Sequence, residues 1–173
     1  MVLKEASPID NAKGTYILIL KADTTKHIQV GRLGKMALRP GFYLYVGSAF
    51  GAGGLKARLD HHLKRVTKAH WHIDYLRRYA QVIEVWYTTD AIRREDQWVA
   101  HMTMLPKISV AYAGFGASDS KAASHLFVST QKPDFAQFCK VTQYVANHAP
   151  IHISRRMTSN HYESNHYESN HDA

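Results

Sequence analysis

The strongest hydrophobic pattern in the chain lies between residues 42 and 47. Its sequence, FYLYVG, alternates with a period of two, which predicts a strand with two different faces. One face is expected to carry Phe42, Leu44 and Val46, and the other to carry Tyr43 and Tyr45. The glycine-rich segment 51–54 follows and allows both a sharp turn and the close approach of a partner.

An amphipathic helix is predicted next, over about 54–66. Apolar residues recur there at helical spacing, at Leu55, Leu59, Leu63 and Val66. Arg58 and His62 are four residues apart, so they lie one above the other at the edge of this stripe, whereas His61 points away from it. A tyrosine of the strand can therefore meet an arginine and a histidine of the helix.

The remaining patterns predict a small antiparallel sheet and three further helices. Strands are expected at 14–21, 27–31, 81–89 and 125–129, with 14–31 forming a hairpin and 32–41 a basic loop. Helices are expected at about 71–80, 92–105 and 133–149. The fold class is therefore α+β, with a central antiparallel sheet of about three to four strands flanked by helices.

Glu95 stands out because it lies on the apolar stripe of the helix predicted at 92–105. It precedes Trp98 by three residues and Val99 by four, so all three face the same way. A buried carboxylate without partners is costly. Glu95 therefore either pairs with an arginine or holds a metal ion.

Length and composition favour one domain inside a reducing compartment. The chain of 173 residues is long enough to bury its own core, and its single cysteine, Cys139, cannot form an internal disulfide. No apolar run reaches the roughly 18 to 20 residues that a membrane span needs. We expect a cytoplasmic protein that does not enter a membrane.

The charge balance suggests a polyanionic partner. Lysine and arginine total 22 against 14 acidic residues, for a net charge of +8. Such a balance favours nucleic acid first and anionic lipid surfaces second, although a solvated surface explains it equally well.

Both ends of the chain differ in character from the domain predicted at 13–150. Residues 1–12 are polar and are expected to form a loose leader. The segment 154–173 contains the pentapeptide SNHYE twice and begins it a third time, which predicts a disordered, low-complexity tail. Histidines of this tail could capture a transition metal ion; they are His161, His166 and His171.

Several short motifs occur in a fixed order. Gly14-Thr15-Tyr16 and Tyr45-Val46-Gly47 lie in two strands, Arg58 in the next helix and Glu95 in a later one. This ordered set resembles the GIY-YIG nuclease superfamily. More narrowly, YVGSA, WHIDYL at 71–76 and GFGASD with SHLF at 114–127 are similar to a bacterial and archaeal subfamily sometimes fused to a DNA-repair glycosylase. The resemblance covers roughly residues 12–130.

The resemblance implies a phosphodiester hydrolase. One divalent ion, Mg²⁺ or Mn²⁺, would be held by Glu95, and Arg58 would clamp two phosphate oxygens. Tyr16 and Tyr45 would position the attacking water and shuttle its proton, and His62 would accept a proton or bind phosphate. A phenol with its ordinary pKa of about 10 is a poor base, so a metal or an arginine would have to lower that pKa.

The implied partner is DNA, cut in one strand, with branched or damaged sites as candidate substrates. Basic residues near the cluster would hold its phosphates. They are Lys56, Lys64, Arg65, Lys68, Arg77 and Arg78. His72 could also contact phosphate, although a purely structural histidine fits the sequence equally well.

The sequence departs from the family pattern at several positions. Thr15 replaces the usual isoleucine, and Gln97 occupies a second acidic position for which Asp96 is an imperfect substitute because it points to another face. Ser120 and Ala122 stand where the subfamily often has cysteines. Two other functions therefore stay open: a nucleic-acid-binding module that no longer cleaves, and a metal-binding protein that uses the histidine-containing tail.

Overall fold

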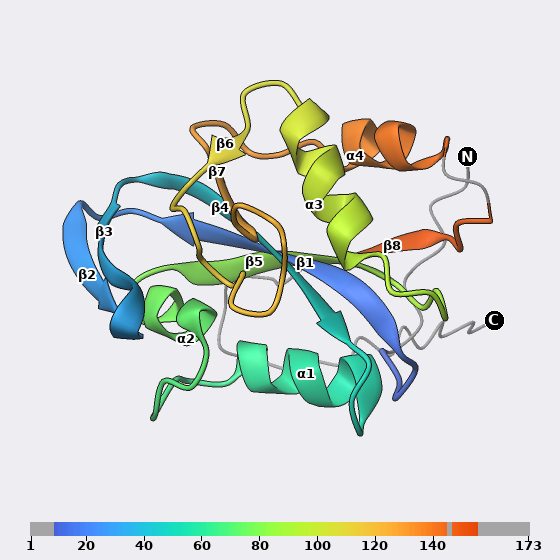
Figure 1. Cartoon of the computed structure of the whole chain (residues 1–173), viewed down its shortest axis with the longest axis horizontal. Coiled ribbons are helices and arrows are strands. Elements are labelled where there is room, and N and C mark those ends of the chain that lie inside the picture. The colour runs from blue at the N-terminus through green and yellow to red at the C-terminus, as the bar shows by residue number, and fades with distance from the viewer. Residues whose placement is uncertain (1–8, 145–146, 156–173) are drawn as a thin grey trace, which may run out of the picture.

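The computed structural model describes residues 9–144 and 147–155 and has an α+β architecture (Figure 1). A six-stranded antiparallel sheet lies at its centre, in the order β6-β7-β4-β1-β5-β8. Its strands are β1 (Gly14–Ala22), β4 (Gly41–Ala49), β5 (Gln81–Thr88), β6 (Ser109–Val110), β7 (Leu126–Ser129) and β8 (Ile151–Arg155). The helices are α1 (Gly54–Leu63), α2 (His72–Arg77), α3 (Glu95–Met104) and α4 (Phe135–Thr142).

The helices form one layer on each face of the sheet. Helices α1 and α2 cover one face, and α3 and α4 cover the other (Figure 1). The alternation predicted for 42–47 is confirmed, because Tyr43 and Tyr45 pack in the α1–α2 layer while Leu44 and Val46 pack in the α3–α4 layer. Strand β1 is central and buried on both faces, which explains its continuous apolar sequence.

The predicted hairpin at 14–31 is wrong, and the sheet has more strands than the three to four expected. Strand β1 pairs with β4 and β5 instead of with the segment that follows it. That segment forms a separate two-stranded ribbon, made of β2 (Lys26–Val30) and β3 (Gly34–Leu38) around the 3-10 turn Gly31–Leu33. Gly31 and Gly34 both have positive φ, which makes this tight local pairing possible within the supposed basic loop.

All four helices are shorter than the apolar spacing predicts. Helix α3 begins only at Glu95 because the preceding residues form a turn, in which the backbone N–H of Ile92 donates to Asp90 at 3.0 Å. Helix α4 begins after Asp134, whose carboxylate accepts from the backbone N–H of Ala136 at 2.8 Å. A turn therefore precedes the start of α3, and a side-chain cap sets the start of α4.

The described parts of the two chain ends, residues 9–12 and 151–155, differ from the loose leader and disordered tail that the sequence predicts. The part of the supposed leader at 9–12 packs on the start of α1, where Leu55 donates its N–H to the carbonyl of Ala12 at 2.8 Å. Residues 151–155 form an edge strand, so the predicted tail at 154–173 overlaps β8. Its SNHYE repeats and histidines lie outside the described residues. None of the helices within 9–144 and 147–155 has the length and apolar character to cross a bilayer.

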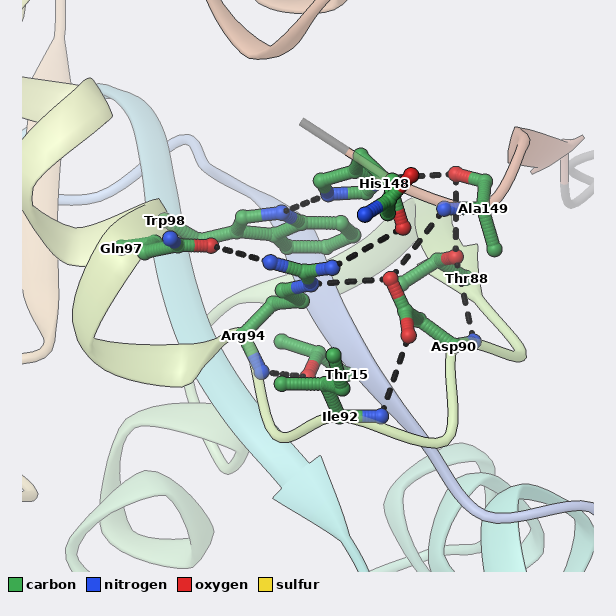
Figure 2. A network of polar contacts seen from close by, with 10 residues as sticks. Thr15, Thr88, Asp90, Ile92, Arg94, Gln97, Trp98, His148 and Ala149 are labelled. Carbon is green, nitrogen blue, oxygen red and sulfur yellow. Dashed lines mark hydrogen bonds and ion pairs between the residues drawn. The ribbon is translucent and has the colours of Figure 1, made fainter. Parts of the chain in front are cut away.

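A buried arginine, Arg94, ties the start of α3 to the sheet (Figure 2). Its Nε donates to Asp90 at 2.8 Å, its Nη1 to Gln97 at 3.1 Å and its Nη2 to the carbonyl of Asn147 at 3.1 Å. Its backbone N–H donates to the hydroxyl of Thr15 on β1 at 3.0 Å. These four bonds fix the residue that immediately precedes Glu95.

We expect Arg94→Met to lower the free energy of unfolding by about 3–5 kcal/mol, because the buried Asp90 carboxylate loses its cation. The neighbouring Arg93 is exposed, with its guanidinium carbon 5.1 Å from the Phe50 ring centroid. Arg93→Met is a matched control that should cost less than about 1 kcal/mol. Urea unfolding followed by tryptophan fluorescence measures both, and equal losses would contradict a structural role for Arg94.

Candidate functional site

Tyr16 and His62 form the centre of a polar cluster in the α1–α2 layer. The Tyr16 hydroxyl lies 2.8 Å from His62 Nε2, and both side chains are buried. Tyr16 pairs across the sheet with Gly47, where a Cβ atom would lie 2.5 Å from the tyrosine hydroxyl. Glycine at position 47 is therefore required for the Tyr16 ring to reach the helix.

Tyr45 lies beside the same histidine. Its ring centroid is 6.3 Å from that of His62 in an edge-on arrangement. Burial raises the pKa of both Tyr16 and Tyr45 above the ordinary value for a phenol, and the negative charge of Glu95 raises it further, although Arg58 opposes this. Both phenols therefore stay protonated, in contrast to the lowered pKa that a tyrosine acting as a base would need.

His62 is a neutral imidazole in this cluster. Burial lowers its pKa to about 3, and the positive charge of Arg77 adds to the effect. The imidazole is therefore neutral near pH 7, and its Nε2 shares a hydrogen bond with the Tyr16 hydroxyl. A ring with so low a pKa is a weak base, so negative charge beside it would have to raise that pKa before it accepts a proton.

Arg58 lies on α1, and its side chain belongs to the same cluster. Its guanidinium carbon is 4.4 Å from the centroid of the Trp71 ring, and its charge acts on the pKa of Tyr16 and Tyr45. Within the described residues no carboxylate pairs with it. Stacking fixes the plane of the guanidinium and leaves its edge for two oxygens of an anion.

Glu95 is the first residue of α3, and its side chain is 18% exposed. Its Oε1 accepts from Nδ1 of His125 at 3.1 Å, and the Ser48 hydroxyl also bonds to the carboxylate. Burial alone raises the pKa of Glu95, but these hydrogen bonds hold it below its usual value. The sequence predicted that Glu95 either pairs with an arginine or holds a metal ion. In the structure it pairs with a histidine, His125.

His125 is a site residue that sequence reasoning missed, although it lies in the SHLF motif. Its Nδ1 contacts both Glu95 at 3.1 Å and the carbonyl of Val46 at 3.3 Å, while its Nε2 is buried without a hydrogen-bond partner in the part of the chain described. Burial lowers the pKa of His125, but the bond to Glu95 raises it above its ordinary value overall. His125 therefore fixes the orientation of the carboxylate.

Two of the residues that depart from the motif pattern, Thr15 and Gln97, both contact Arg94. The Thr15 hydroxyl accepts the backbone N–H of Arg94, which an isoleucine could not do. Gln97 accepts from the guanidinium of the same arginine and so acts in positioning α3. Asp96 is exposed, in line with its expected direction away from the stripe.

Only part of the expected phosphate-binding set is available to a ligand. Arg77 is 5% exposed at its side chain and donates to Asp74 and to the carbonyl of Lys64. His72 accepts the N–H of Gly116 at 3.0 Å, which favours the structural alternative. The exposed members of the set are Lys56, Lys64, Arg65, Lys68 and Arg78, of which Lys56 pairs with Asp60 at 2.7 Å.

Two groups could hold a cation. Glu95 is ionised and partly exposed, so it fits a magnesium ion that keeps most of its water ligands. His61, His62 and Asp74 also offer ligand atoms within 4.8 Å of one another. Asp74, however, already accepts bonds from two backbone N–H groups and from Arg77, which makes it a poor metal ligand.

We expect the ring signals of His62 to show no titration between pH 8 and about 4.5 in NMR spectra, because its folded-state pKa is about 3. Since this pKa is below the value of about 6.5 in the unfolded chain, His62 contributes stability above pH 6.5 that is lost as the pH falls toward 3. His62→Gln assigns the signals. A titration midpoint above pH 5 would show that the ring is not buried and neutral.

Comparison with known proteins matches the chain to one protein family. The chain matches the family model described as "Domain of unknown function DUF123" over residues 15–147, which includes every residue of the cluster from Tyr16 to His125. No curated protein and no solved structure gives a significant match.

Proposed function

The chain belongs to the DUF123 family, and from the geometry of its polar cluster we propose that it is a metal-dependent endonuclease of GIY-YIG type that hydrolyses phosphodiester bonds of DNA. One observation carries the proposal: Tyr16 is bonded to a neutral His62 at 2.8 Å, and an ionised Glu95 lies close enough to raise the pKa of both tyrosines. An arginine and an ionised carboxylate whose charges act on the same two tyrosines support this proposal.

Each side chain has a role that its surroundings support. Arg58 would bind two oxygens of the scissile phosphate and stabilise the charge that develops on them. Tyr16 would orient the attacking water, receive its proton and release its own hydroxyl proton to Nε2 of His62. Tyr45, held protonated, would donate a hydrogen bond to a phosphate oxygen. A Mg²⁺ or Mn²⁺ ion on Glu95 would neutralise phosphate charge when bound.

The proposed substrate is DNA, cut in one strand. The exposed basic residues around the C-terminal end of α1, among them Lys64 and Arg65, give it a phosphate-binding surface. A binding module that does not cleave is the second candidate, and one observation favours it. Among the described residues Glu95 is the carboxylate better suited to hold the ion, and it is already engaged by His125 and Ser48.

Supercoiled plasmid separates these two functions. We expect nicking that requires Mg²⁺ or Mn²⁺, and we expect Glu95→Gln and Arg58→Ala each to lower its rate by about 100-fold or more while DNA binding persists. Asp96→Asn removes a neighbouring exposed carboxylate and should keep the wild-type rate. Absence of nicking with either ion would leave the binding module, and full activity of Glu95→Gln would exclude this site.

A second experiment addresses His125. Because His125 orients the carboxylate, His125→Gln should raise the magnesium concentration needed for half-maximal nicking by about 10- to 100-fold. The rate at saturating magnesium should change much less. His101→Gln, the same exchange near the other end of α3, serves as the control. A lower maximal rate with an unchanged magnesium requirement would contradict the orienting role.

A further inference from the structure

A basic pocket lies next to the cluster and has no assigned role. Its volume is about 830 Å³, and it is formed by the C-terminal ends of α1 and α2 together with the paired ends of β1 and β5. This volume is in the range of about 300 to 1,000 Å³ that is typical of small-molecule sites. The lining residues that matter here are His62, Lys64, Arg65, Arg77, Arg78 and Tyr79.

The pocket carries an excess of positive charge. Lys64, Arg65 and Arg78 are exposed, and none of them pairs with a carboxylate within residues 9–144 and 147–155. Asp23 also lines the pocket, but it pairs with Lys21 at 3.2 Å. The net charge therefore suits an anion.

Tyr79 adds an aromatic ring to this basic lining. Tyr79 is 39% exposed as a residue, and Nζ of Lys26 lies 4.6 Å from its ring centroid. Of the large apolar side chains exposed in the described residues, only Tyr79 lines this pocket. One exposed ring among cations suits a nucleobase with its phosphate, whereas a membrane surface would need several apolar groups to insert.

His62 connects the pocket with the cluster. It lines the pocket, while its Nε2 lies 2.8 Å from the Tyr16 hydroxyl. Its Nδ1 is a buried atom for which the described residues supply no hydrogen-bond partner. The charge of Arg77, which also lines the pocket and acts on the ring, favours an anion over a metal ion here.

We propose that the pocket binds one unpaired nucleotide of a DNA strand next to the scissile phosphate. Its base stacks on Tyr79, and its phosphates contact Lys64, Arg65 and Arg78. This inference rests on the proposed function and names its substrate class: DNA in which at least one nucleotide is unpaired and can leave the helix.

Fluorescence anisotropy with the full chain tests this without cleavage when EDTA is present. Three labelled DNAs are compared: a fully paired duplex, the same duplex with a one-nucleotide bulge, and that bulge with an abasic nucleotide. The last two have equal numbers of phosphates and differ only in the base. We expect the bulge with a base to bind at least about fivefold more tightly than the abasic bulge, which corresponds to one stacked base.

Two residues are then varied. Tyr79→Ala should abolish the difference between the two bulges, and Tyr79→Phe should keep it. Tyr144→Ala removes a more exposed tyrosine outside the pocket and should have no effect. Arg78→Ala should weaken binding of all three DNAs and flatten the salt dependence. Lys140→Ala removes one exposed charge from α4, on the opposite face of the sheet, and should change little.

Three results would overturn the proposal. They are equal affinity of the wild-type chain for the two bulges, a difference that persists in Tyr79→Ala, and binding to phosphatidylserine vesicles that Arg78→Ala abolishes while DNA binding is unchanged. Because no metal is present, the outcome is independent of cleavage. A chain that prefers the bulge but never nicks DNA refutes the endonuclease alone, and a chain that nicks without this preference refutes the pocket alone.

Discussion

Tyr16 crosses the neighbouring strand at Gly47, and the polar cluster depends on that crossing. Any side chain at position 47 would collide with the tyrosine, since even a Cβ atom would lie 2.5 Å from its hydroxyl. Because position 47 has no side chain, the Tyr16 ring extends across β4, and its hydroxyl forms a buried hydrogen bond of 2.8 Å with His62 on α1. The pairing of β1 with β4 therefore brings the Tyr16 hydroxyl within hydrogen-bonding distance of His62.

The carboxylate enters the cluster from the other layer of the fold. Glu95 begins α3, and the position of that helix start is set by Arg94, which bonds to Thr15 on β1 and to Asp90 after β5. Because Tyr16 is the next residue after Thr15, one short stretch of β1 positions both the phenol and the helix that carries Glu95. The charge of Glu95 at this helix start raises the pKa of Tyr16 on β1 and of Tyr45 on the neighbouring strand β4.

The hydrophobic pattern and the order of the motifs predicted which residues lie together in the cluster better than they predicted which strands pair in the sheet. The period of two separated the faces of β4, and the motif order brought together Tyr16, Tyr45, Arg58, His62 and Glu95. Strand pairing could not be predicted in the same way, because β1 and its partner β5 are more than 50 residues apart and the intervening chain forms its own ribbon. The partners of Glu95 were missed for the same reason, since Ser48 and His125 approach it only after folding.

The basic pocket depends on contacts that also hold the fold together. Arg77 on α2 donates to the carbonyl of Lys64 after α1 and pairs with the fully buried Asp74 at 3.2 Å. The bond to the Lys64 carbonyl ties the two helices together, and the ion pair with Asp74 within α2 holds the guanidinium in position. The same arginine forms part of the pocket lining and lowers the pKa of His62.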